Sequence, residues 1–252
     1  MTLVEASLLS SPRTDAPAPA GPFEARWLGR MDYEAAHALQ KRLVAERADG
    51  VIPDQLLLLE HPAVLTIGRH SDPAHILASP ETLAARGVAV HRVERGGEVT
   101  YHGPGQLVAY PIVALADRGL LLRPLVRALE SALVATCASF GVTAERRDGH
   151  PGCWCDPDGA APRKIGALGL RVERGVSYHG IALNVSVALA DFELIDPCGM
   201  PGVTSTSIDA ELAGSSRQPL PPPSTASVER AARAFAPAFA AAIGADLTWP
   251  GV

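Results

Sequence analysis

The chain has 252 residues, 47% of them hydrophobic, which is enough apolar sequence to bury the core of one large domain or two small ones. Its net charge of −5 argues against nucleic acid as the main ligand, because nucleic-acid-binding proteins usually carry a basic surface. Apolar runs stay below the roughly 18 residues that indicate a transmembrane helix, and no signal-peptide pattern opens the chain. The four cysteines show no disulfide framework, so we expect a cytoplasmic protein.

Local patterns divide the chain into a tail and a folded part. Residues 1–21 are rich in Ala, Ser and Pro and predict a disordered or loosely attached tail, while 22–252 predict a single domain. Apolar spacing and capping residues predict helices at about 32–47, 124–141 and 227–243. Short apolar or alternating runs predict strands at 55–60, 63–67, 88–93, 153–155, 164–172 and 176–187.

Particular residues mark the ends of the predicted helices. Asp32 and Ser227 are candidate N-caps, because their side-chain oxygens can accept hydrogen bonds from free backbone N–H groups. Gly141 is expected to end the second helix, and Pro237 to kink the last one. Helices and strands do not alternate strictly, so the predicted fold class is α+β, a mixed β-sheet with packed helices.

The most informative stretch runs from Arg95 to Ile112 and reads RGGEVTYHGPGQLVAYPI. Its first half is glycine-rich, and its second half is an apolar strand. Glycine allows positive φ and close approach of the backbone to a ligand, so this segment predicts a pocket wall built from main-chain groups. It matches neither the dinucleotide-binding nor the Walker glycine pattern.

Cys198 lies in a Pro-Cys-Gly turn that predicts a rigid loop. One interpretation is an exposed nucleophilic thiol; the other is a buried small hydrophobic residue, as free cysteines often are. Cys137 lies in a helical pattern and predicts packing. A metal site of Cys153, Cys155 and Cys198 lacks the second paired knuckle of structural zinc, so no metal is predicted.

Lys164 is one of only two lysines, with Lys41, in an otherwise arginine-rich chain. It is either an ordinary solvated lysine or the partner of the Cys198 thiol. A nearby cation lowers the pKa of a thiol, and lysine, unlike arginine, can also exchange a proton. His102 and His179 each follow a tyrosine and precede a glycine. We interpret them as shaping the pocket through hydrogen bonds to backbone, with a base as the alternative.

These motifs resemble those of the lipoyl(octanoyl) transferase family, octanoyl-[acyl-carrier-protein]:protein N-octanoyltransferases. The resemblance covers about residues 24–210 and includes the segments 95–112, 164–172, 177–185, 192–199 and 204–208. It implies the fold shared by lipoate–protein and biotin–protein ligases. It also implies that Cys198 is the acyl-thioester nucleophile and Lys164 the residue that lowers its pKa. The acyl-binding residues implied are Arg95, Gly96, Gly97, Glu98, Val99, Thr100, Tyr101, His102, Ala167, Leu168, Gly169, Gly180, Ile181 and Ala182.

The resemblance further implies an octanoyl donor, acyl carrier protein, whose phosphopantetheine carries the acyl group, and no other cofactor. The implied acceptors are lipoyl domains of 2-oxoacid dehydrogenases and the glycine cleavage H protein. Both kinds of partner are expected to be acidic, so a basic rim is predicted from Arg69, Arg95, Arg146, Arg147, Arg163 and Arg171. Two alternatives stay open: an ATP-dependent lipoate or octanoate ligase, and a non-catalytic protein that only binds acyl carrier protein.

Overall fold

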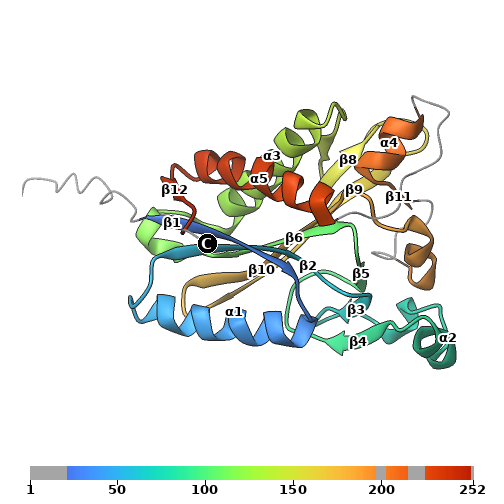
Figure 1. Ribbon diagram of the computed structural model, residues 1–252, viewed down its shortest axis with the longest axis horizontal. Coiled ribbons are helices and arrows are strands. Elements are labelled where there is room, and N and C mark those ends of the chain that lie inside the picture. Colours follow the sequence, from blue (N-terminus) through green and yellow to red (C-terminus); the bar gives the residue numbers. More distant parts are fainter. Residues whose placement is uncertain (1–21, 197–202, 215–224, 251–252) are drawn as a thin grey trace, which may run out of the picture.

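The computed structural model describes residues 22–196, 203–214 and 225–250 (Figure 1). The strands of its main sheet are β1 (Phe23–Arg30), β2 (Asp54–Glu60), β6 (Gln106–Ile112), β7 (Glu145–Arg147), β8 (His150–Cys155), β9 (Arg163–Glu173), β10 (Val176–Asn184), β11 (Thr204–Ser205) and β12 (Leu247–Thr248). A smaller sheet consists of β3 (Val64–Ile67), β4 (Ala89–Arg92) and β5 (Thr100–His102). The α-helices are α1 (Tyr33–Ala48), α2 (Pro80–Ala85), α3 (Leu122–Ser139), α4 (Ile208–Gly214) and α5 (Thr225–Ala242). Short 3-10 helices cover Pro73–His75, Ala116–Arg118 and Leu189–Leu194.

The main sheet is mixed, as the sequence predicts. Its order is β12-β1-β2-β6-β10-β9-β8-β7, with β11 beside β9, and the smaller sheet has the order β4-β3-β5. β1 runs parallel to β2 and β12, whereas β6, β10, β9 and β8 are antiparallel to their neighbours along that order. The predicted α+β class is therefore confirmed.

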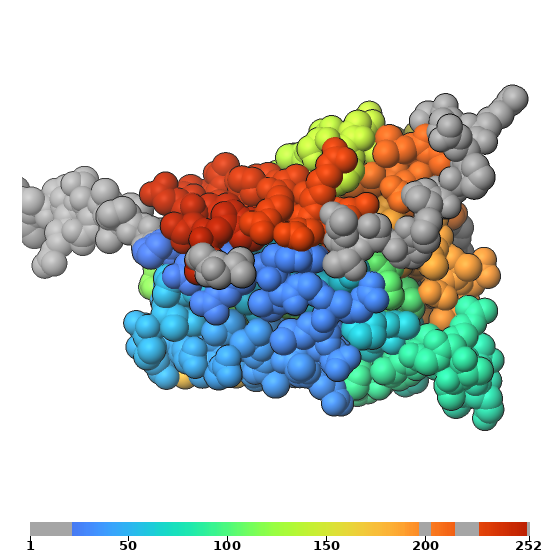
Figure 2. Space-filling model, in the orientation of Figure 1, coloured from blue at the N-terminus to red at the C-terminus, as the bar shows by residue number. Residues whose placement is uncertain are grey.

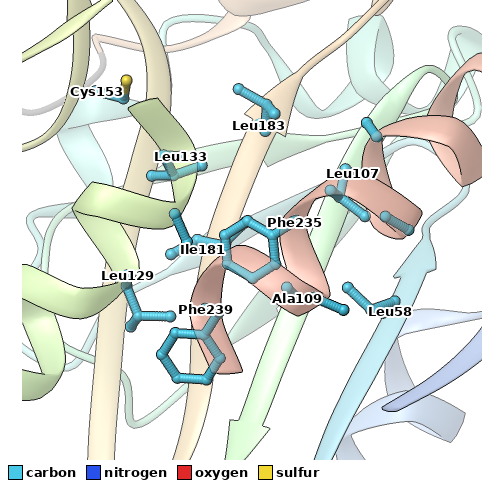
Figure 3. Packing of buried hydrophobic residues seen from close by; sticks show 14 of the residues in the cluster. Leu58, Leu107, Ala109, Leu129, Leu133, Cys153, Ile181, Leu183, Phe235 and Phe239 are labelled. Atoms are coloured by element: carbon cyan, nitrogen blue, oxygen red, sulfur yellow. The ribbon is translucent and has the colours of Figure 1, made fainter. Parts of the chain in front are cut away.

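Helices cover both faces of the main sheet, with α3 and α5 on one face and α1 on the other (Figures 1 and 2). Side chains of β6 alternate between the two cores: Leu107 and Ala109 belong to the α3/α5 side, and Val108 and Tyr110 to the α1 side. Figure 3 shows Phe235 and the other labelled α3 and α5 residues packed over the strands. Burying one such large apolar side chain stabilises the fold by about 1.5–3 kcal/mol.

The predicted strands and helices all occur, with shifted ends. Gly141 follows α3 with φ +84°, and the N–H of Val142 bonds to the carbonyl of Cys137, so the predicted stop is confirmed. Asp32 precedes α1 but makes no side-chain capping bond, so that part of the prediction is wrong. Ser227 lies inside α5, which begins at Thr225. A run of Ser and Thr offers several possible caps, and local pattern cannot choose among them.

The predicted tail, 1–21, lies outside the described residues. Within the described ranges, no helix is both long and apolar enough to cross a membrane.

Candidate active site

A hollow with about 560 Å³ of empty space, its open mouth included, lies between the glycine-rich segment and the centres of β9 and β10. Its wall contains Lys164 and all the predicted acyl-binding residues except Gly96 and Tyr101. Four of the lining residues were not assigned to acyl binding in the sequence analysis: Tyr33, Tyr110, Lys164 and His179. The structure thus brings residues of the segments 95–102, 164–169 and 179–182, which are far apart in the sequence, into the wall of one cavity, together with Tyr33 and Tyr110.

The close packing of this wall depends on two facing glycines. Gly169 of β9 pairs with Gly180 of β10, and Leu168 pairs with Ile181. A Cβ on Gly169 would lie 2.7 Å from the carbonyl oxygen of Gly96, and one on Gly180 would lie 2.0 Å from that of Ala109. Neither position has room for a side chain, so the glycines let the backbone segments lie directly against one another.

Arg95 holds the glycine-rich segment onto β3. It is buried, its Nε lies 3.2 Å from Thr66 Oγ1, and its Nη2 donates to the carbonyl oxygen of Thr66 at 2.6 Å. Its Nη1 also donates to the carbonyl of Gly96 at 3.0 Å. A guanidinium engaged in this way cannot form part of an exposed basic rim, so that role for Arg95 is corrected.

Two predicted acyl-binding residues do not line the cavity. Side chains alternate along β5, so Tyr101 points away from the face that carries Thr100 and His102. Tyr101 instead packs against Phe192, and its hydroxyl donates to Asp191 Oδ2 at 2.7 Å. Gly96 lies against β9, where its N–H bonds to the carbonyl of Leu170 at 3.1 Å. Both lie behind the wall, and their predicted part in acyl binding stays a prediction.

Lys164 lies near the start of β9 and lines the cavity. Its ammonium lies 5.1 Å from the centre of the Trp154 ring, in a cation–π contact. Trp154 is fully buried and pairs with Lys164 across β8 and β9. The buried ring of Trp154 thus provides a fixed surface beside the Lys164 ammonium.

Cys198 lies outside the described residues, so its predicted contact with Lys164 stays a prediction. The chain is anchored on both sides of that segment. The N–H of Asp196 bonds to the carbonyl of His75 at 2.8 Å. On the other side, Ser205 of β11 pairs with Lys164, and the N–H of Thr206 bonds to the Lys164 carbonyl at 2.9 Å. Ser205 and Thr206, a few positions after Cys198 in the sequence, therefore lie beside Lys164.

A chain of buried hydrogen bonds links the glycine-rich segment to Thr206, which directly follows β11. His102 Nδ1 lies 2.7 Å from Gln106 Oε1, and Gln106 Nε2 donates to Asn184 Oδ1 at 2.9 Å. Asn184 Nδ2 in turn donates to the carbonyl of Thr206 at 2.8 Å. The predicted partner of His102 was backbone, but a glutamine side chain takes that place. Gln106 and Asn184 were missed because polar residues in buried strands have no signature of their own.

The imidazoles around the cavity are neutral at neutral pH. Burial lowers the pKa of His102 to about 3 and that of His179 to about 3. Behind them, burial lowers the pKa of His61 to about 4; its Nε2 lies 2.8 Å from the Tyr110 hydroxyl. Burial also raises the pKa of Tyr33 to about 12. These four groups add no charge to the wall, which suits an apolar chain.

The remaining cysteines are packing residues. Cys137, Cys153 and Cys155 are all buried in the core on the α3/α5 side, as predicted for Cys137. Contact with Cys137 and burial raise the pKa of Cys153, and burial raises that of Cys155 to about 12. Thiols held protonated in this way are poor metal ligands and poor nucleophiles.

Comparison with known proteins agrees with this fold. The family model of the lipoyl protein ligase A/B catalytic domain matches residues 32–239. An octanoyltransferase from Acidobacterium capsulatum is 49% identical over 193 residues, 73% of this chain and 78% of that protein. One from Chloroflexus aggregans is 50% identical over 185 residues, covering 72% and 82%.

Solved structures share the fold. The bi-partite lipoate protein ligase of Thermoplasma acidophilum superposes with a TM-score of 0.62 at 15% identity, covering 93% of this chain and 88% of that one. Lipoate-protein ligase A bound with ATP gives 0.62 at 13% identity, covering 92% and 89%. The chain belongs to the lipoyl protein ligase A/B catalytic domain family. Within that family it is an acyltransferase of the lipoyl(octanoyl) transferase type.

Proposed function

We propose that this enzyme transfers an octanoyl group from octanoyl-acyl carrier protein to the target lysine of lipoyl domains, through a thioester on Cys198. The observation that carries the proposal is the shared cavity of Lys164 and the glycine-rich segment. A second support is the pairing of Ser205 with Lys164, seven positions after Cys198 in the sequence. The chemistry proposed needs no metal or nucleotide.

In the first step the Cys198 thiolate attacks the octanoyl carbonyl. A new C–S bond forms, the bond to phosphopantetheine breaks, and the leaving thiolate takes a proton from the Lys164 ammonium, so the carrier departs as a thiol and Lys164 is left neutral. Thioester exchange is nearly balanced, so the enzyme mainly supplies an activated nucleophile and donors for the oxyanion. Backbone N–H groups of the glycine-rich segment are the candidate donors.

In the second step the neutral lysine amine of a lipoyl domain attacks the acyl-Cys198 thioester. The amide forms, the Cys198 thiolate leaves, and Lys164 is the candidate to take the proton released by the amine. The acceptors proposed are lipoyl domains of 2-oxoacid dehydrogenases and the glycine cleavage H protein. Two protein substrates that use one acyl-enzyme in turn imply ping-pong kinetics.

Intact-mass measurement after mixing the enzyme with octanoyl-carrier protein, and no acceptor, tests the intermediate. We expect a gain of one octanoyl group that maps to Cys198 and is absent in Cys198→Ser. Cys137→Ser is the matched control, because Cys137 is buried in the core and should leave the acylation site intact. Full transfer activity in Cys198→Ser would rule out the acyl-enzyme.

A ligase reaction is the alternative that the fold allows, since a solved neighbour is a lipoate-protein ligase bound with ATP. That likeness, at 13% identity, extends to the fold only. Free octanoate and ATP should therefore give no octanoylated lipoyl domain. Efficient ATP-dependent formation of octanoylated lipoyl domain would contradict the transferase proposal and favour a ligase.

A further inference from the structure

Three potential metal ligands from three separate elements meet at the edge of the cavity. His37 lies on α1, Glu94 follows β4, and His179 lies on β10. One ligand atom of each lies within 4.8 Å of the others, and His37 Nε2 lies 3.1 Å from Glu94 Oε1. The rings of His37 and His179 are stacked with their centres 5.6 Å apart.

His179 combines two unfavourable features. Its φ is +56°, a left-handed conformation that non-glycine residues seldom adopt. Its Nε2 is buried and has no hydrogen-bond partner among the described residues, although its backbone N–H is bonded to Gln40 Oε1 at 2.8 Å. A buried polar group without a partner is destabilising. A ligand that accepts the lone pair of this nitrogen would remove that penalty.

Glu94 supplies the carboxylate of the group. The Tyr178 hydroxyl donates to its Oε1 at 2.9 Å, and His37 Nε2 lies 3.1 Å from the same oxygen. Lys41 opposes a cation, since its Nζ lies 3.9 Å from the same oxygen, but its shorter bond is to Glu173 at 2.5 Å.

We propose that His37, Glu94 and His179 form a zinc-binding site with an open fourth position. Two imidazoles and one carboxylate are a known three-ligand donor set for zinc. Zinc–nitrogen bonds of about 2.0–2.1 Å place neighbouring tetrahedral donors about 3.3 Å apart, close to the present spacing of His37 and Glu94. Only His179 has to approach, and Tyr178 remains to orient the carboxylate.

The alternative is a structural ion pair between His37 and Glu94 beside a stacked ring. A zinc titration of the full chain, with accessible thiols blocked by iodoacetamide and a chromophoric chelator as competitor, separates the two. We expect one saturable site per chain, weakened at least about tenfold in His37→Ala and in Glu94→Gln. Circular dichroism confirms that each variant is folded.

His91→Ala is the matched control. Like His37, His91 is partly exposed, stacks on Tyr33 and faces a glutamate, here Glu34. Its affinity for zinc should equal that of wild type. Cobalt(II) in place of zinc should give a tetrahedral spectrum without a thiolate charge-transfer band. Absence of saturable binding, unchanged affinity in His37→Ala and Glu94→Gln, or a thiolate band would overturn the proposal.

Discussion

Arg95 and Thr66 are joined by three hydrogen bonds, two to the threonine hydroxyl and one to its carbonyl oxygen. The pair ties the glycine-rich segment to β3, and Thr66 itself does not line the cavity. The shape of the cavity wall therefore depends on a residue that a substrate would never contact.

Replacing the Thr66 hydroxyl tests this dependence. Thr66→Val leaves the buried guanidinium of Arg95 short of two bonds, and we expect the free energy of unfolding to fall by about 1.5–3 kcal/mol. Thr66→Ser keeps the hydroxyl and should retain most of that stability. Urea unfolding measures both. Equal stability of the two variants would show that the hydroxyl bonds contribute nothing.

Gly169→Ala should damage the cavity wall, because the added methyl group would lie 2.7 Å from the carbonyl oxygen of Gly96. Such overpacking typically costs about 1–3 kcal/mol, and displacement of the glycine-rich segment should also slow octanoyl transfer. Gly214→Ala is the control, since no atom of the described residues lies within 4 Å of the added atom. Melting temperature and transfer rate are the measurements, and loss in the control but not in Gly169→Ala would contradict the account.

Lys164→Arg retains a positive charge but removes a group that can exchange a proton. We expect turnover to fall by about 10²-fold or more, and the pH profile of iodoacetamide labelling at Cys198 to move upward if the new cation lies farther from the sulfur. Lys41→Arg is a natural control, because Lys41 is the only other lysine and does not line the cavity. Unchanged labelling and unchanged turnover in Lys164→Arg would dismiss Lys164 from the mechanism.

The buried imidazoles should make the protein acid-labile. In the unfolded chain histidine has a pKa of about 6.5, whereas burial lowers the pKa of His61 to about 4 and those of His102 and His179 to about 3. Their contribution to stability is present above about pH 6.5 and is lost as pH falls towards those folded-state values, because only the unfolded chain takes up the protons. Three protons give a slope of at most about 4 kcal/mol per pH unit.

Urea unfolding at pH 7 and pH 5 measures that slope. His102→Gln, which cannot titrate, should reduce it by about a third. Glu94 acts in a lower window: its stabilising charge is present above about pH 4.5 and is lost as pH falls to about 2. A flat profile between pH 7 and pH 5 would mean that these rings are not neutral in the folded state.

Much of the fold could be predicted from local patterns. Gly141 as the end of α3 follows from backbone sterics, and the strand at 176–184 follows from its apolar run. The start of α5 could not be predicted, because several neighbouring Ser and Thr residues are possible caps and the helix begins at Thr225, before Ser227. The position of Tyr101 behind the cavity wall could not be predicted from the motif as a whole, because alternate side chains of β5 face opposite ways.

The site was predictable only in part, because some of its residues meet only when the helices pack against the sheet. The motifs around Arg95, Lys164 and Gly180 are contiguous and therefore visible in a single sequence. Tyr33 is brought to the cavity, and His37 to Glu94, only by the packing of α1 against the sheet. Contacts between residues so far apart leave no periodic trace in the chain.

The hydrogen-bond chain from His102 through Gln106 and Asn184 to Thr206 has a consequence for building chimaeras within this family. If the glycine-rich segment alone were grafted into a relative without asparagine at the position of Asn184, the Gln106 amide would lose its side-chain acceptor. The two segments 95–106 and 184–206 should therefore be exchanged together in one chimaera.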